Sequence, residues 1–178
     1  MRMNKSSVYQ IVGYKNRGKT NLVCRLVDVL VAQGNKVATI KHDGHEFEFD
    51  RKGSDTWLHR HSGACWTAIT ASNGTAIVHN EALQLEQLIQ QAPSDSIILV
   101  EGFKLESYPK LVLVRWEEDL TLLEQLQGIT AVVLWPEIWE NQQMRARIEC
   151  IAPLNVFELD DTEGIAQHIE KLQQSVCS

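Results

Sequence analysis

Short, largely apolar runs recur along the chain, separated by stretches in which apolar residues follow a helical spacing. The runs lie at residues 8–12, 36–41, 97–100, 111–114, 130–134 and 156–159. Continuous apolar runs of this length are typical of strands that are buried on both faces of a parallel sheet. The pattern therefore predicts six strands in a mostly parallel sheet.

Apolar residues at intervals of three and four predict helices between these runs. The clearest helix begins after residue 20, and its apolar face is formed by Leu22, Val23, Leu26, Val27 and Leu30. Further helices are predicted at 55–61, 83–89 and 165–172. Strands that alternate with helices in this way are typical of an α/β domain with helices on both faces of the sheet.

Two additional runs, 65–71 and 75–79, flank the dipeptide Asn73-Gly74, which favours a tight hairpin turn. Residues 42–54 are polar and dotted with glycine, so they predict a long connecting loop or a small hairpin. Long loops in compact α/β domains are usually functional. The expected fold is thus a three-layer α/β domain with a mostly parallel central sheet and a small β-hairpin excursion.

Length and composition agree with one globular domain. The chain has 178 residues, which is enough for one domain but too few for two domains of ordinary size. We therefore expect a single domain over residues 1–178. Hydrophobic residues make up 44% of the chain and supply a core. There is no secretory signal, and no apolar run approaches the roughly 18 residues that span a bilayer. We therefore expect a cytoplasmic protein with no membrane partner.

The formal net charge is −6, and no lysine and arginine cluster indicates a nucleic-acid partner. The cations that do gather are Lys15, Arg17, Lys19, Lys41, Arg51 and Lys52. In an acidic protein, such a local reversal of charge suits an anionic ligand. The four cysteines are scattered, and Cys24 and Cys65 are predicted to be small core residues. Most of the five tryptophans are also expected in the core, with one or two exposed as anchors for a partner.

The segment 13–20 reads GYKNRGKT and fits the pattern G-x-x-x-x-G-K-[ST] between a predicted strand and a predicted helix. In such a loop, successive backbone N–H groups form a nest for phosphate oxygens. We expect Lys19 to reach the β- and γ-phosphates and Thr20 to bind Mg²⁺. The predicted nucleotide-binding residues are Gly13, Tyr14, Lys15, Asn16, Arg17, Gly18, Lys19, Thr20, His42 and Lys104. The fold class is accordingly predicted to be P-loop NTPase-like.

Glu101 follows the apolar run 97–100 directly. In P-loop folds, a carboxylate at the tip of a neighbouring strand holds Mg²⁺. Hard cations prefer oxygen ligands, so Thr20 and Glu101 are the predicted metal ligands. Lys104 is placed to pair with phosphate. The alternative is that Glu101 only begins a polar loop.

Four segments carry a family resemblance: 13–20; Ile40-Lys41-His42 with His45; Asp50-x-x-Gly53-x-Asp55-Thr56 with Gly63-Ala64; and Val100-Glu101-Gly102-Phe103-Lys104. In these segments the chain resembles the MobB family, nucleotide-binding adapters of molybdopterin-guanine dinucleotide (molybdenum cofactor) biosynthesis. The resemblance implies a homodimeric GTP-binding protein that uses Mg²⁺, hydrolyses GTP weakly, and assists the guanylyltransferase that joins GMP to molybdopterin. It covers about the first 115 residues.

The chain departs from the family pattern at two places. Asn16 and Arg17 stand where small residues are usual, and Ser54 replaces a common lysine. Arg17 is therefore expected to alter phosphate affinity or hydrolysis. No N-K-x-D motif follows a late strand, so the preference for GTP over ATP rests on the resemblance. Beyond about residue 116 no functional residue is predicted.

Other residues leave alternatives open. Asp50, together with Lys19, is a candidate catalytic residue that supports the Mg²⁺ shell or orients a water, but Asp and Gly here also suit solvated turns. His42 contacts phosphate or a partner's substrate, or lies in a solvated loop. A zinc site is disfavoured by the spacing of the candidate ligands His42, His45, His59, His61 and Cys65.

Two functional hypotheses follow from these residues. The first is the GTP-binding adapter. The second is a self-sufficient ATP- or GTP-dependent small-molecule kinase or ligase, which requires an acceptor pocket and a base near the γ-phosphate. Asp50 and His42 are the candidate bases.

Overall fold

A computed structural model describes residues 7–43, 50–151 and 155–176. Contacts within the chain divide it into two compact units. Residues 1–42 and 89–178 form the first, here called the sheet unit, and residues 43–88 form the second, here called the hairpin unit. Each unit is described by itself.

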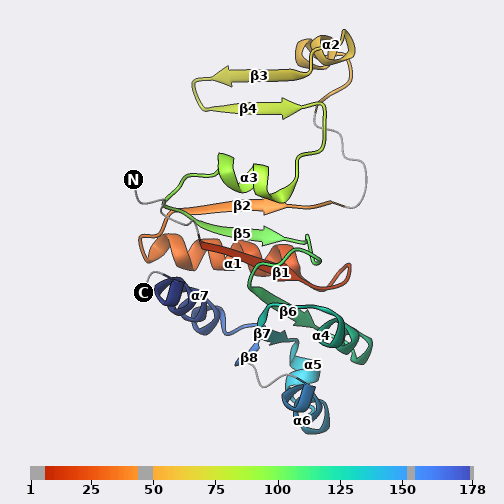
Figure 1. The fold of residues 1–178 in the computed structure, drawn as a ribbon, viewed down its shortest axis with the longest axis vertical. Helices are drawn as coiled ribbons and strands as arrows, with labels where there is room; N and C mark the ends of the chain where they lie inside the picture. The colour runs from red at the N-terminus through yellow and green to blue at the C-terminus, as the bar shows by residue number, and fades with distance from the viewer. Residues whose placement is uncertain (1–6, 44–49, 152–154, 177–178) are drawn as a thin grey trace. The chain divides into compact units, whose positions relative to one another are not determined.

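The sheet unit is built on a six-stranded sheet with the strand order β2-β5-β1-β6-β7-β8 (Figure 1). Its strands are β1 (Ser7–Val12), β2 (Val37–Lys41), β5 (Ile97–Glu101), β6 (Lys110–Val114), β7 (Ile129–Leu134) and β8 (Asn155–Glu158). Each neighbouring pair in this order runs parallel. The predicted strands and the mostly parallel sheet are therefore confirmed.

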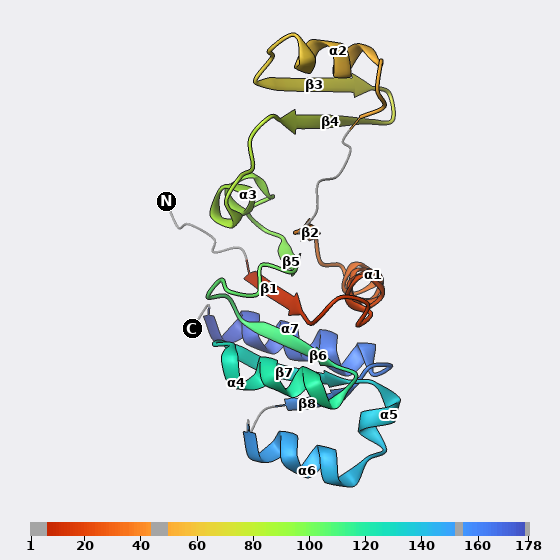
Figure 2. The ribbon, with the colours of Figure 1, turned by 90° about the vertical axis from the view of Figure 1, so that its right-hand side faces the viewer.

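Helices cover both faces of the sheet. Successive strand residues point to opposite sides, and strands that are buried at every position therefore need cover on both faces. Leu111 and Leu113 pack with α1 (Lys19–Ala32) and α7 (Thr162–Val176). Val112 and Val114 pack instead with the 3₁₀ helix η1 (Glu117–Leu120) and with α4 (Thr121–Gln125), α5 (Pro136–Trp139) and α6 (Gln142–Ile151). Figure 2 shows α7 and α4 on opposite sides of β6 and β7. The three-layer architecture is confirmed.

The predicted helices at 55–61, 83–89 and 165–172 correspond to α2 (Asp55–His61), α3 (Leu85–Gln91) and α7. The helices α4, α5 and α6 were not predicted. The first two have only five and four residues, too short for a helical repeat to stand out. In α6 the only residue classed as buried is Ile148, so its apolar stripe is thin.

The hairpin unit contains α2 and a two-stranded antiparallel sheet of β3 (Trp66–Ala71) and β4 (Gly74–His79). Ala71 pairs with Gly74, so the turn residues are Ser72 and Asn73, one position before the predicted Asn73-Gly74. Ser54 caps α2 by accepting a hydrogen bond from the backbone N–H of Trp57. Within β3 and β4, only Thr67 is buried. The small hairpin excursion is thus confirmed, and its side chains are largely exposed.

The sequence prediction about the burial of two cysteines is wrong. Cys24 and Cys65 are exposed rather than in the core. Cys24 lies outside the buried stripe of α1, which is formed by Leu22, Val23, Leu26 and Leu30, and Cys65 precedes the exposed strand β3. The prediction for the tryptophans holds in part: none is fully buried, Trp135 and Trp139 pack against the core, and Trp66 and Trp116 are exposed by 51% and 43%.

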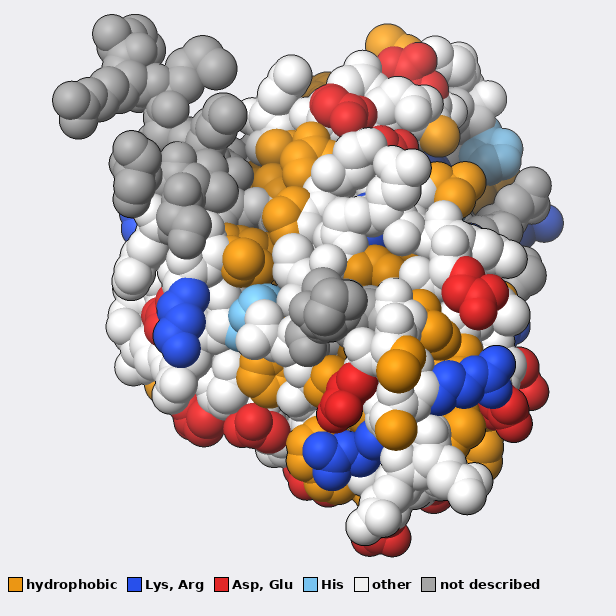
Figure 3. Space-filling model, turned by 60° about the horizontal axis from the view of Figure 1, so that its bottom comes forward, with side chains coloured by type: hydrophobic (Ala, Val, Ile, Leu, Met, Phe, Trp, Pro, Cys, Tyr) orange, Lys and Arg blue, Asp and Glu red, His pale blue; other side chains and the backbone are white. Residues whose placement is uncertain are grey.

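Surface charges are mixed in sign on the face that Figure 3 presents, where Lys and Arg side chains stand beside Asp and Glu. Among the residues described, none of the helices combines the length and the apolar character that crossing a bilayer requires.

Candidate nucleotide-binding site

The glycine-rich loop joins β1 to α1 at the carboxyl edge of the sheet. Asn16 and Gly18 have positive φ angles of 61° and 83°, so the backbone curls twice within three residues. Gly18 is required for a second reason, because a Cβ there would lie 3.0 Å from the Trp135 ring. Segments in which left-handed residues alternate with right-handed ones form backbone nests, whose N–H groups bind phosphate oxygens. The loop thus has the conformation that the motif predicted.

Lys19 is the first residue of α1, and its Nζ donates a hydrogen bond of 2.8 Å to the carbonyl oxygen of Tyr14 across the loop. Burial lowers the pKa of Lys19 from its usual value, whereas the charge of Glu101 raises it. The nearby cations Lys41, Arg17 and Lys104 lower this pKa further. A bound polyanion would offset both the partial desolvation of this ammonium and its repulsion by the neighbouring cations.

Thr20 and Glu101 meet although 81 positions separate them. The Thr20 hydroxyl lies 2.9 Å and 3.0 Å from the two carboxylate oxygens of Glu101, to which it donates. Glu101 is 8% exposed, and Lys41 on β2 approaches one of its oxygens at 3.8 Å. The pair forms because β5 lies beside β1, with Glu101 in register with Ile11. The two predicted metal ligands are therefore side by side.

Gln10, a residue that the sequence analysis did not single out, shapes the turn after Glu101. Its side-chain amide donates to the carbonyl oxygens of Gly102 and Phe103, at 3.1 Å and 2.5 Å. Both of those residues have positive φ angles, 95° and 49°. Gln10 itself is fully buried. Its signal in the sequence is a polar residue at the centre of the apolar run 8–12.

His42, Tyr14 and Lys104 lie around the same loop. The backbone N–H of His42 donates to the carbonyl of Glu101 at 2.9 Å, and its ring lies 4.6 Å from that of Phe103. Lys104 Nζ lies 5.5 Å from the centre of the Tyr14 ring. The structure thus brings all three predicted residues to the carboxyl edge of the sheet; that they bind nucleotide stays a prediction.

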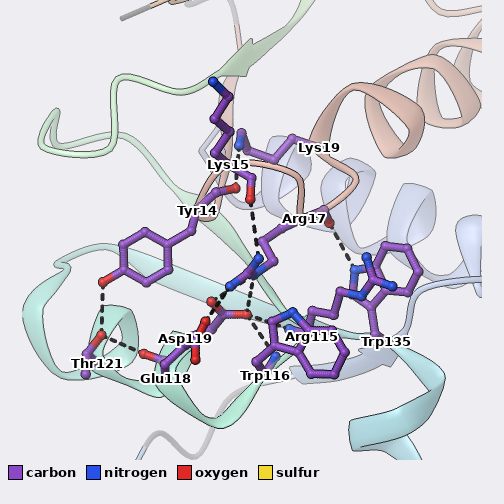
Figure 4. A network of polar contacts seen from close by, with 10 residues as sticks. All are labelled: Tyr14, Lys15, Arg17, Lys19, Arg115, Trp116, Glu118, Asp119, Thr121 and Trp135. Atoms are coloured by element: carbon purple, nitrogen blue, oxygen red, sulfur yellow. Dashed lines mark hydrogen bonds and ion pairs between the residues drawn. The ribbon is translucent and has the colours of Figure 1, made fainter.

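The Arg17 side chain extends toward η1, away from the side chains of Lys15 and Lys19, as Figure 4 shows. Its Nε donates to both carboxylate oxygens of Asp119, at 3.0 Å and 2.8 Å, and its Nη2 to Glu118 at 2.9 Å. The backbone carbonyl of Arg17 accepts a 3.0 Å hydrogen bond from the indole N–H of Trp135. The sequence analysis assigned neither Asp119 nor Trp135 a role at this site, because the family resemblance does not extend to either residue.

Asp50 belongs to the hairpin unit, where it accepts hydrogen bonds from the hydroxyls of Ser54 and Thr56. These hydroxyls hold the pKa of the Asp50 carboxyl below its usual value. Its catalytic role stays a prediction. Of the zinc candidates, His45 lies outside the described residues. Within the described parts of the chain, no group of three His, Cys, Asp or Glu side chains is placed to hold a metal.

A mainly apolar groove of about 410 Å³ lies between α1 and β2. At one end it reaches Thr20, Lys41 and Glu101, and along α1 it is lined by Val23, Cys24 and Val27. The exposed position of Cys24 is explained by this groove. The sequence analysis did not predict it.

Comparison with known proteins places these features in one family. Residues 8–135 match the family model "Molybdopterin guanine dinucleotide synthesis protein B", MobB. A molybdopterin-guanine dinucleotide biosynthesis adapter protein of Escherichia coli is 33% identical over 176 residues, which cover 90% of each chain. The one from Haemophilus influenzae is 32% identical over 133 residues, 72% of this chain and 75% of that protein. The crystal structure of a MobB homologue from Bacillus stearothermophilus superposes with a TM-score of 0.66 and 30% identity, covering 97% of this chain and 99% of that one.

Proposed function

This chain belongs to the MobB family, the adapters of molybdopterin-guanine dinucleotide biosynthesis, and we propose that it acts by binding Mg²⁺-GTP in the loop between β1 and α1. The observation that carries the proposal is the 2.9 Å contact between Thr20 and Glu101 beside Lys19. A phosphate nest, a lysine and two oxygen ligands are the parts with which P-loop proteins hold a metal-bound nucleotide.

Magnesium fits the residues present. Mg²⁺ prefers oxygen ligands and is usually held by one or two protein groups together with phosphate oxygens. The Thr20 hydroxyl and the Glu101 carboxylate would hold it, and Lys41 lies against the same carboxylate. When bound, the ion would offset the negative charge of the phosphate oxygens.

We further propose that the nucleotide is GTP and that its hydrolysis is slow. The names of the relatives refer to a guanine dinucleotide, which favours a guanine base. Asp50, the predicted water-orienting residue, is engaged by two hydroxyls of its own turn, which favours slow turnover. Residues 1–178 would then serve as one nucleotide-binding domain, with the hairpin unit inserted between β2 and β5.

An adapter role implies a partner enzyme, and we propose that this partner is the guanylyltransferase that transfers GMP to molybdopterin. Calorimetric titration of the purified protein with GTP, ATP and GDP, in Mg²⁺ and in EDTA, tests the nucleotide. We expect GTP with Mg²⁺ to bind with a Kd of about 1 μM, or about −8 kcal/mol, at least tenfold tighter than ATP. Repeating the titration with the partner should strengthen binding. Equal affinity for ATP and GTP, or none for either, would contradict the proposal.

The groove between α1 and β2 favours one alternative, a small-molecule kinase or ligase that places its acceptor there. That enzyme would turn over nucleotide at about one per second when only the small-molecule acceptor is added. A turnover assay with and without the guanylyltransferase separates the two functions, because the adapter requires the partner.

We also propose a homodimer, supported by the exposed apolar residues of the hairpin unit. Trp66 and Ile77 are 51% and 54% exposed, and the strand register places them on the same face of the two-stranded sheet. A two-stranded sheet has little stability of its own in water, and clusters of exposed large apolar side chains mark interaction surfaces.

Replacing Ile77 with aspartate is expected to shift the protein from dimer to monomer in light scattering at micromolar concentration, because the carboxylate would be desolvated in the interface. Gln143→Asp adds the same charge on an exposed position of α6 and should leave the dimer intact. A dimer that persists in the Ile77 variant would place the interface elsewhere.

A further inference from the structure

Arg17 lies in the phosphate loop, and its guanidinium contacts both the Lys15 carbonyl of that loop, at 3.4 Å, and the acidic residues of η1. Its side chain is 13% exposed, and that of Asp119 is fully buried. The two are joined through Nε and two carboxylate oxygens at 3.0 Å and 2.8 Å. Charge-assisted contacts of this kind are shorter and stronger than neutral hydrogen bonds and fix orientation. The pair therefore ties the loop to η1.

The Asp119 carboxylate also holds the backbone at the start of η1. One of its oxygens accepts hydrogen bonds from the N–H groups of Arg115 and Trp116, at 2.8 Å and 3.0 Å. With Arg17, the carboxylate is thus held on several sides (Figure 4). Because β6 places residue 115 at the carboxyl edge of the sheet beside β1, this anchor is attached to the core rather than to a free loop.

Trp135, the residue that follows β7, also contacts the same two loop residues. The indole N–H of Trp135 donates to the carbonyl of Arg17, and the indole ring lies directly against Gly18. The Arg115 guanidinium lies 4.0 Å from the centre of that ring, on which it stacks. Residues 17 and 18 are therefore held by the segments that follow the strands β6 and β7.

These contacts act next to a left-handed residue. Asn16, immediately before Arg17, has a φ of 61°, a conformation that asparagine adopts more readily than most non-glycine residues. The contacts of residues 17 and 18 therefore help to fix the loop at the point where its backbone turns. We propose that Arg17 is a positioning residue: by pairing with Asp119 it holds the phosphate loop in its binding conformation, without itself contacting phosphate. This proposal rests on the proposed function only where nucleotide affinity is the readout.

Four variants test the proposal. Arg17→Ala removes the contact, Arg17→Lys keeps the charge but loses the planar guanidinium, and Asp119→Asn keeps the shape but loses the anion. Arg147→Ala is the matched control, because Arg147 pairs with Glu117 of the same η1 in an exposed ion pair outside the loop. We expect about tenfold weaker Mg²⁺-GTP binding in the first three variants and less than twofold change in the control.

The sign of the Asp119→Asn effect is decisive. If Arg17 acted as a phosphate cation, removing its carboxylate partner would free it and strengthen nucleotide binding. A positioning role predicts the opposite. Tighter binding in Asp119→Asn, or unchanged binding in Arg17→Ala, would overturn the proposal. Circular dichroism establishes that each variant is folded under the conditions used, and Arg17→Lys keeps a cation beside the buried Asp119 if Arg17→Ala unfolds.

Hydrogen exchange of the loop amides gives a readout that needs no nucleotide. We expect the N–H groups of residues 16–20 to exchange at least about tenfold faster in folded Arg17→Lys than in wild type or in Arg147→Ala. If wild type fails to bind GTP but this difference is found, the proposed function fails and the positioning role stands. If exchange is equal in these three proteins, the positioning role is wrong.

Discussion

Replacing Lys19 with alanine is expected to lower the affinity for Mg²⁺-GTP by at least about 100-fold, which corresponds to about 2.8 kcal/mol. The Lys19 ammonium is partly desolvated and already directed across the loop to the Tyr14 carbonyl. Hydrogen bonds to charged groups contribute about 1.5–3 kcal/mol each, and Lys19 is expected to make more than one with a triphosphate. Titration calorimetry measures the loss.

The fold is expected to survive this change. The lowered pKa of Lys19 means that the folded protein holds its proton less tightly than the unfolded chain does. Between that lowered pKa and the ordinary value of 10.5, the unfolded chain binds more protons, so the Lys19 contribution to stability rises with pH. At neutral pH this cation therefore opposes folding slightly, and thermal denaturation should show no large loss of stability in the alanine variant.

Lys36→Ala is the control for loss of one positive charge. Lys36 precedes β2 at the opposite edge of the sheet and pairs with Asp95 on the surface. Its removal should change nucleotide affinity less than twofold. Equal affinities of the Lys19 and Lys36 variants would show that the loop is not the phosphate site.

Thr20→Ala and Glu101→Gln are expected to abolish the effect of Mg²⁺ on GTP binding. In wild type the affinity in Mg²⁺ should exceed that in EDTA by at least about tenfold, and in either variant the two should agree within about twofold. Glutamine keeps an acceptor for the Thr20 hydroxyl, so Glu101→Gln is expected to preserve the local structure. Paired titrations in Mg²⁺ and EDTA measure the difference.

Thr39→Ala serves as the matched control, because Thr39 lies in the same groove on β2 and is exposed. It should retain the full effect of Mg²⁺. If Glu101→Gln also retained it, the carboxylate would only begin a polar loop, which is the alternative that the sequence left open.

The elements of the sheet unit were predictable where the local pattern is strong. The run 97–100 is apolar throughout, and β5 forms there. The helix after the loop shows its repeat over more than two turns, and Leu22, Leu26 and Leu30 are indeed buried. Short helices with thin apolar stripes, such as α5 and α6, carry too little periodicity to be recognised.

Exposure was less predictable than secondary structure. Cys24 was expected in the core because it lies in an apolar helix, but burial depends on which side of the helix faces the sheet. The tryptophans are only partly buried for a related reason. Trp135 packs against the core, yet it lies at the carboxyl edge of the sheet, where its indole N–H reaches the loop.

Local sequence alone determined the phosphate loop, the strands on either side of it, and an acidic residue at a strand tip. It could not determine which strands become neighbours, because pairing is selected by burial of whole sheet faces across distant segments. The order β5-β1-β6 brings Glu101 to Thr20 from one side and Asp119 to Arg17 from the other. For Arg17, an unusual side chain in a familiar motif, only the tertiary structure supplied its buried partner.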